Sequence, residues 1–242
     1  AGSAINAGLS ALGESNIGSA HLQFENAFQL NSTSSKAAFG LALTKLLLLA
    51  EDPKAKEVLQ YLGRSPIYSS MIFGSTGMFA KLANGAGCGQ TIDFLVENLP
   101  WNNIPSFGEF FEMIPAAAKG DKVVDILVEL IPRIDEILEL LEVAHADPAF
   151  NLNVPAGLIY LPGELQFGLP EAHLLEAGLH TVRGSLLLVD SYDWGFALKD
   201  DFGEDTTDQE RVVRANARFL YLESDESLEA SRASFRSAAQ AV

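Results

Sequence analysis

The sequence predicts a mainly α-helical array that contains a long amphipathic helix pair and one small β-hairpin. Apolar residues recur at steps of three and four over long stretches, and Pro and Gly stand where such helices should begin and end. Apolar and polar residues alternate, with a period of two, only at about 157–168. The chain has 242 residues, of which 48% are hydrophobic, so it is long enough to bury a sizeable core.

The first quarter of the chain has the pattern of four short antiparallel helices. Pro53 follows two acidic residues and suits the first position of a helix, while Gly63 suits the left-handed residue that ends one. The expected helices span residues 5–12, 18–30, 35–50 and 53–62.

Ala20, Phe24 and Ala27 fall on one stripe of the second of these helices, where small residues let a neighbouring helix approach closely. The stripe runs at once into the apolar helix 35–50, and together they resemble the end of one tetratricopeptide (TPR) repeat and the start of the next. Alanine stands where the family has a large aromatic residue early in its first helix. The resemblance covers residues 1–64 and implies a helical scaffold, without carrying over any functional residue.

We expect residues 1–64 to form TPR-like helical hairpins and residues 65–242 to form a helical domain, either separate from the first or continuous with it. Glycine and proline break the pattern between residues 65 and 118 into loops and short helices, at 92–99 and 107–114. Large apolar residues concentrate here. They either close one end of the core or line an apolar groove for a ligand, whose candidate residues are Trp101, Phe107, Phe110, Phe111 and Ile131.

The remaining chain contains two long helical patterns and the change of period. Pro132 should kink the first helix near its middle, because proline lacks an amide hydrogen and clashes with the preceding turn. Pro162-Gly163 suits a type II turn between two short alternating runs, which predicts the hairpin. The expected elements are a helix over 121–144, the hairpin at about 157–168, a helix over 170–197, an acidic loop over 199–210 and one or two helices over 211–241.

His173, Glu176 and His180 form the sharpest chemical constellation. Steps of three and four residues place two imidazoles and a carboxylate on one helical face, a set that binds zinc or non-haem iron. This face lies opposite the apolar stripe of its helix, and an exposed polar face would use the same residue types. Both interpretations stay open here.

Two further features have weaker chemical implications. The acidic loop 199–210 is rich in oxygen ligands that calcium accepts, but its spacing does not match an EF-hand, so a solvated acidic connector is the better explanation. Cys88 is the only cysteine, which excludes an internal disulfide. No nucleophile elbow, phosphate loop or dinucleotide fingerprint appears, so we expect no enzyme activity and no cofactor.

Charge and hydropathy limit the class of partner. The 32 acidic and 16 basic residues give a formal net charge of −16 at pH 7, which disfavours nucleic acid and favours cations. No apolar run approaches the roughly 20 residues that a membrane-spanning helix needs. The small residues at the start, Ala-Gly-Ser-Ala, suit a terminus left by signal-peptide removal, and we expect a bacterial periplasmic or secreted protein.

These features predict a non-enzymatic interaction or assembly protein. Helical repeats offer side-chain-lined faces and open edges, so binding a protein partner or self-association follows from the architecture. The alternative is a carrier that holds a lipid or another hydrophobic small molecule in the apolar groove. A metal-dependent enzyme with its site at His173, Glu176 and His180 is the third hypothesis.

Overall fold

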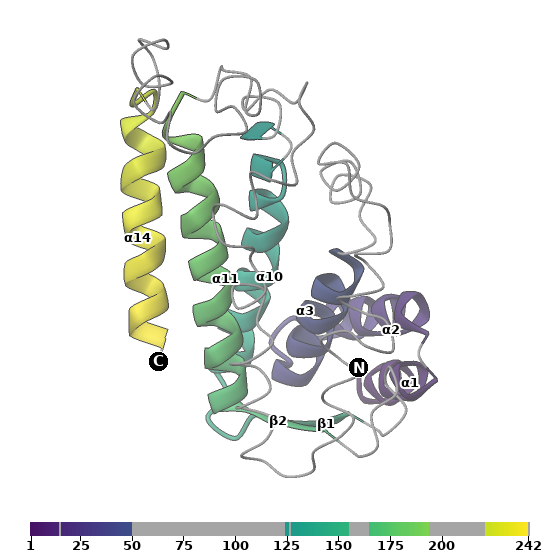
Figure 1. Ribbon diagram of the computed structural model, residues 1–242. Coiled ribbons are helices and arrows are strands. Elements are labelled where there is room, and N and C mark those ends of the chain that lie inside the picture. The colour runs from purple at the N-terminus through teal and green to yellow at the C-terminus, as the bar shows by residue number, and fades with distance from the viewer. Residues whose placement is uncertain (15, 50–123, 126, 155–164, 194–220, 242) are drawn as a thin grey trace.

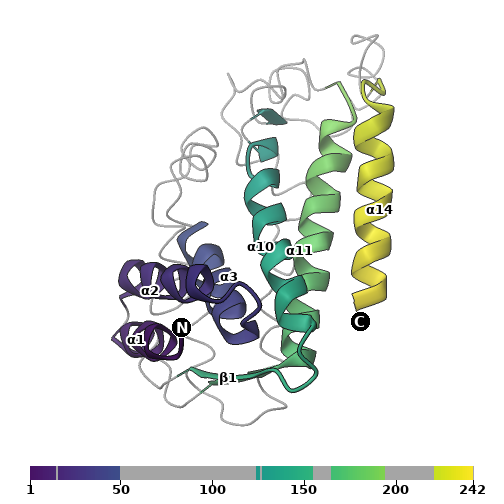
Figure 2. The same ribbon diagram turned by 180° about the vertical axis from the view of Figure 1, so that it is seen from behind.

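The computed structural model describes residues 1–14, 16–49, 124–125, 127–154, 165–193 and 221–241, and the statements below concern these residues. It confirms a mainly α-helical fold with one small antiparallel sheet (Figures 1 and 2). No described helix is both long and apolar enough to cross a membrane. The elements are α1 (Gly2–Gly13), α2 (Ile17–Leu30), α3 (Ser35–Leu49), α10 (Ile131–His145), β1 (Asn151–Val154), β2 (Leu165–Gly168), α11 (Leu169–Asp190) and α14 (Asp225–Ala241).

The first three helices pack around one aromatic ring. Ala20, Phe24 and Ala27 are the buried residues of α2, as the sequence stripe predicts. The Phe24 ring lies against Gly8 of α1 and Gly40 of α3; a Cβ atom at Gly8 would stand 2.9 Å from the ring, and one at Gly40 would stand closer still. Close approach of three helix backbones therefore requires glycine at both positions.

The third helix, α3, is the centre of the molecule. It is buried nearly all round, because it packs against α2 on one side and α10 on the other. At its first turns the Phe39 ring lies 5.0 Å from that of Phe150 and 5.2 Å from that of Phe167, so the two-stranded sheet covers this end of α3. The Ser35 hydroxyl also donates to Asp147, at 2.7 Å.

Pro132 does not kink a continuous helix, so that expectation is wrong. The chain turns at residues 129–130, and α10 begins at Ile131 with Pro132 in its first turn. The amide hydrogens of the first turn have no acceptor within a helix, so a proline costs little there, whereas it would break the ladder further along. The helix then runs to His145 with its apolar residues against α3.

The sheet confirms a small antiparallel pair but corrects its first strand. β2 lies within the expected hairpin, yet its partner is Asn151–Val154 rather than the run just before Pro162-Gly163. β1 alternates between buried and accessible residues, with Leu152 and Val154 in the core. Burial of these two side chains favours β1 as the strand that pairs with β2. Residues 155–164 lie outside the described residues.

Among the described helices, α11 and α14 pack along each other, and α11 lies between α10 and α14 (Figure 1). α11 ends at Asp190 rather than 197, and α14 begins at Asp225. Gly184 of α11 is the centre of their contact. The Ser231 hydroxyl donates to the Gly184 carbonyl at 2.7 Å, and the Phe235 ring lies on Gly184, where there is no side chain. Small side chains thus bring these two helices close together.

Several expectations lie outside the described residues. They are the helices 53–62, 92–99 and 107–114, the acidic loop 199–210, and the first part of 211–241. The boundary near residue 64 lies there too, so the two-domain division stays a prediction. Within the described residues, one apolar cluster includes members of α1, α2, α3, α10, both strands and α11.

Gly40→Ala should lower the free energy of unfolding by about 1–3 kcal/mol, because the added methyl group overlaps the Phe24 ring in a packed core. Gly18→Ala is the matched control. Nothing lies within 4 Å of a Cβ at Gly18, so that change should be neutral or stabilise by up to about 1 kcal/mol. Urea unfolding measures both. Equal stability of the Gly40 variant and the parent protein would contradict this packing.

Candidate metal centre

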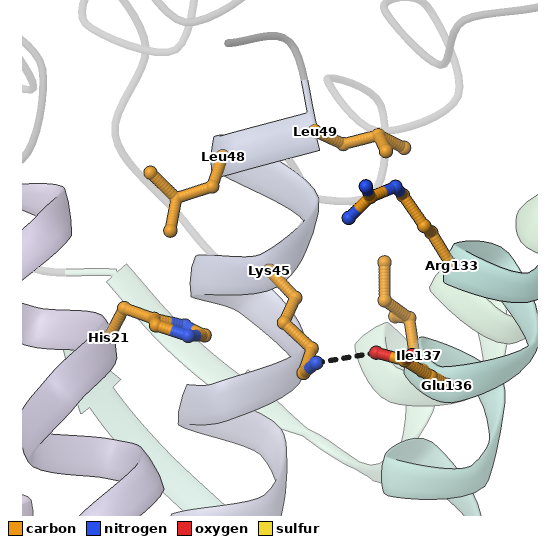
Figure 3. A pocket seen from close by; sticks show the side chains of 7 residues that line it. All are labelled: His21, Lys45, Leu48, Leu49, Arg133, Glu136 and Ile137. Carbon is orange, nitrogen blue, oxygen red and sulfur yellow. Dashed lines mark hydrogen bonds and ion pairs between the residues drawn. The ribbon is translucent and has the colours of Figure 1, made fainter. Parts of the chain in front are cut away.

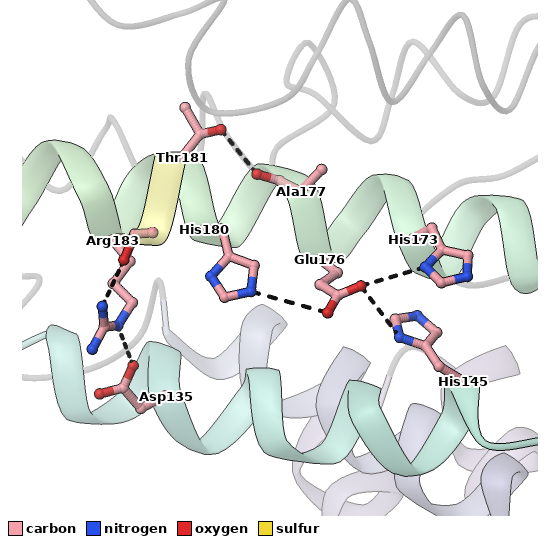
Figure 4. Close-up of polar contacts among 9 residues, drawn as sticks. Asp135, His145, His173, Glu176, Ala177, His180, Thr181 and Arg183 are labelled. Atoms are coloured by element: carbon pink, nitrogen blue, oxygen red, sulfur yellow. Dashed lines mark hydrogen bonds and ion pairs between the residues drawn. The ribbon is translucent and has the colours of Figure 1, made fainter. Parts of the chain in front are cut away.

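The start of α11 fixes the direction in which its polar residues point. Pro170 lies in the first turn, and the Glu171 carboxylate accepts a hydrogen bond from the Gly168 amide at 2.8 Å, which caps the helix. With this start, His173, Glu176 and His180 project toward α10 (Figure 4). Because α11 is the middle helix of three, Glu176 and His180 are largely buried on this face, whereas His173 is 43% exposed.

The structure brings a third histidine to this face. His145, the last residue of α10, stacks on His173 with ring centroids 4.0 Å apart. The carboxylate Oε2 of Glu176 lies 3.3 Å from His145 Nδ1 and 3.4 Å from His173 Nδ1 (Figure 4). One ligand atom from each of these three residues lies within 4.8 Å of the others. Three of the four histidines of the chain therefore meet at one carboxylate.

The two separations from Glu176 Oε2 match those of ligands on a shared metal ion, and the one to His173 is also within the range of a long hydrogen bond. Hydrogen bonds between charged nitrogen and oxygen groups are shorter, at about 2.7–2.9 Å. Two ligand atoms bound to one tetrahedral zinc at about 2.0–2.1 Å each stand about 3.3 Å apart. The 3.3 Å and 3.4 Å distances to Oε2 match that spacing.

His180 approaches the other oxygen of the same carboxylate. Its Nε2 lies 4.0 Å from Glu176 Oε1, too far for a direct hydrogen bond and near enough to orient the carboxylate through a bridging group. His145 Nε2 and His180 Nδ1 are buried and have no hydrogen-bond partner. These two atoms are the ring nitrogens that do not face Glu176, since His145 turns Nδ1 and His180 turns Nε2 toward the carboxylate.

Burial favours the neutral imidazole, the form that binds metal, at His145 and His180. The side chains of His145, Glu176 and His180 are 13%, 17% and 20% exposed. Burial lowers the pKa of His145 and of His180 below 6.5; the Glu176 carboxylate opposes this for both. Neutral imidazole has the lone pair that a metal requires. His173 is 43% exposed, which opens one side of the cluster to solvent.

A neighbouring ion pair fixes the spacing of the two helices. Arg183, one turn beyond His180, donates to Asp135 of α10 through Nε at 2.5 Å and to Ser234 of α14 through Nη1 at 2.6 Å. One guanidinium thus ties α11 to both of its neighbours. This contact helps to hold His145 opposite His173 and Glu176.

The other candidate residues have different outcomes. Ile131 is buried at the first position of α10, 8% exposed, as part of the core. Cys88 and the acidic loop 199–210 lie outside the described residues, so their roles stay predictions. So do the aromatic residues of the expected groove, Trp101, Phe107, Phe110 and Phe111.

Sequence reasoning missed His145 as a member of this cluster. The spacing along one helix indicates which residues share a face, but His145 lies on a different helix, 28 positions before His173. The available signal was the predicted pairing of two long helices. His145 ends the first, and His173 lies near the start of the second.

Comparisons with protein-family models, curated proteins and solved structures gave no match for this chain. The TPR resemblance of residues 1–64 therefore stays a prediction. The geometry of the cluster and of its surroundings carries the functional argument.

The metal-free protein should lose stability as the pH falls below 6.5. The pKa values of His145 and His180 are lower in the folded protein than in the unfolded chain, so the unfolded chain takes up their protons first as the pH falls. The free energy of unfolding is therefore unaffected by these two histidines above pH 6.5, and it decreases below that pH. NMR titration should show both imidazoles titrating below 6.5. In Glu176→Gln the His145 pKa should fall further, because the carboxylate that raises it is gone. An unchanged or higher value would contradict the arrangement.

Proposed function

We propose that this protein binds one divalent transition-metal ion, with Zn²⁺ as the best fit, through His145, His173 and Glu176. The observation that carries the proposal is the position of Glu176 Oε2, at 3.3 Å and 3.4 Å from the Nδ1 atoms of two histidines on different helices.

The residue types favour a transition metal over calcium or magnesium. Imidazole suits zinc, copper, iron and nickel, whereas calcium and magnesium take oxygen ligands. The formal charge of −16 raises the local concentration of any cation.

His180 has a distinct role in this proposal. As the structure stands, its Nε2 faces Oε1 of Glu176, on the opposite side of the carboxylate from the other two histidines. It therefore acts as a positioning residue that orients the carboxylate, rather than as one of the three ligands. The fourth position on the metal remains for water or another small ligand.

The broader roles expected from the sequence remain proposals. They are the non-enzymatic interaction or assembly role, the carrier alternative, and the periplasmic or secreted location. α2 exposes Leu22 and Leu30, 62% and 65% accessible, which is compatible with a protein contact, although single exposed leucines are common on protein surfaces. The metal site is compatible with each role and does not depend on any of them.

Isothermal titration of the protein with Zn²⁺, after treatment with a chelating resin, should give one ion per chain. Replacing a ligand by glutamine, in His145→Gln, His173→Gln or Glu176→Gln, should weaken binding at least about 100-fold, since each removes one of three bonds. His180→Gln should weaken it about 10–100-fold, as for a residue that orients a ligand.

His21→Gln is the matched control, because His21 is the one histidine of the chain outside the cluster. It should bind zinc as the parent protein does. Circular dichroism of the metal-free variants checks that each is folded; His173, 43% exposed, is the position that tolerates substitution best. Binding that is absent in the parent, or lost equally in the His21 variant, would refute the site.

A further inference from the structure

Glu142 of α10 is an acidic residue beside the metal cluster that the one-ion site does not use. It stands one turn before His145, and a step of three residues places the two side chains on one face of the helix. Residues 142–145 therefore have the Glu-x-x-His spacing with which a helix in a bundle can supply ligands to a pair of metal ions. The Glu142 side chain is exposed, so it can rotate without disturbing the core.

Helical spacing turns Glu142 toward α11. Asp135 lies seven residues before it, which is close to two full turns, so both carboxylates leave α10 in nearly the same direction. Asp135 pairs with Arg183 of α11. Glu142 therefore points toward the same neighbouring helix.

The register of the two helices sets the level of Glu142. His145 stacks on His173, and the Arg183 ion pair lies ten residues further along α11 and ten residues back along α10, so the helices run antiparallel. A step of three residues from the stacked rings toward that ion pair reaches Glu142 on α10 and Glu176 on α11. The two carboxylates therefore lie at the same level of the helix pair.

The charge of Glu142 is felt at both ends of the cluster. Burial lowers the pKa of His145 and of His180, and the Glu142 carboxylate acts against this lowering at both rings. A carboxylate that affects both rings lies close to both of them. This agrees with the position that the helical spacing and the register give to Glu142.

Two other carboxylates of α10 already have cationic partners. Asp135 pairs with Arg183 on the α11 side. On the α3 side, Glu136 Oε2 lies 2.6 Å from Lys45 Nζ, at the edge of a cleft (Figure 3). Within the part of the chain that the structure describes, Glu142 forms no such ion pair, so its carboxylate is available to a metal ion.

We propose that the site holds a second divalent transition-metal ion, bound by Glu142, His180 and Oε1 of Glu176, with the Glu176 carboxylate bridging the two ions. This inference rests on the first ion, which Oε2 of Glu176 helps to bind. His180, which orients the carboxylate when one ion is present, becomes a ligand of the second. Its Nε2 lies 4.0 Å from Oε1, about 0.7 Å beyond the spacing of two ligands on one tetrahedral zinc, and side-chain rotation closes this gap.

The second ion binds more weakly than the first. Paired metal ions in proteins lie about 3.5–4 Å apart, where two divalent ions repel each other. The two carboxylates offset this repulsion in part, and we expect the second dissociation constant to be on the order of 100-fold larger. At equimolar Zn²⁺ the first site fills and the second stays largely empty.

Equilibrium dialysis of the resin-treated full-length chain against Zn²⁺ tests the second ion. As free Zn²⁺ rises to about 1 mM, the bound metal should rise from one ion per chain to two. Glu142→Gln should lose the second ion and bind the first within about threefold of the parent affinity. Glu139→Gln is the matched control, since it removes the same charge from an exposed position on the same helix, and it should keep both ions.

Anomalous diffraction at the zinc edge, from crystals soaked in excess Zn²⁺, should show two peaks about 3.5–4 Å apart, the second within about 2.2 Å of Glu142 and His180. One ion per chain at every Zn²⁺ concentration would overturn the second site and leave the first intact. So would a second ion that Glu142→Gln retains, that Glu139→Gln loses equally, or that lies only on surface carboxylates. Absence of any bound ion would overturn both sites.

Discussion

Helix α10 has to pack against two different partners, and the rest of the structure depends on this constraint. One side meets α3, which is largely buried, and is therefore aliphatic: Ile134, Ile137 and Leu141 are each at most 1% exposed. The other side meets α11 and carries Asp135 and His145. Because α3 also holds the α1–α2 pair and α11 holds α14, α10 links the two helical groups.

The two faces of α10 explain why polar chemistry gathers where it does. Apolar burial against α3 supplies most of the favourable free energy, so the α11 side can include groups that bury at a cost. Arg183 with Asp135 satisfies one part of that interface. At its other end three imidazoles and one carboxylate meet. A bound ion would compensate the cost of burying these groups and join α10 to α11 through a second, stronger contact.

The sequence could predict what depends on local periodicity. The stripe of Ala20, Phe24 and Ala27 follows from helical spacing, and so do the starts of α2, α3 and α11. The common face of His173, Glu176 and His180 is a property of one helix and was predicted for the same reason. Pro132 was misplaced, because a proline indicates that a helix is interrupted but not whether it bends or restarts.

Contacts between distant segments could not be predicted in this way. His145 reaches Glu176 only because α10 and α11 pack antiparallel in one particular register, which side-chain packing decides. The partner of β2 was missed for a similar reason. Pro162-Gly163 is a strong local turn signal, whereas the burial of Leu152 and Val154, which selects β1, depends on Phe39 and the α3 core.

The most direct measurement is anomalous diffraction at the zinc absorption edge from crystals of the protein grown with equimolar Zn²⁺. The account predicts one strong peak between α10 and α11, within about 2.0–2.2 Å of His145, His173 and Glu176, and His180 beside the carboxylate. A peak bound by surface carboxylates alone, or a clear map at this position without a peak, would contradict it.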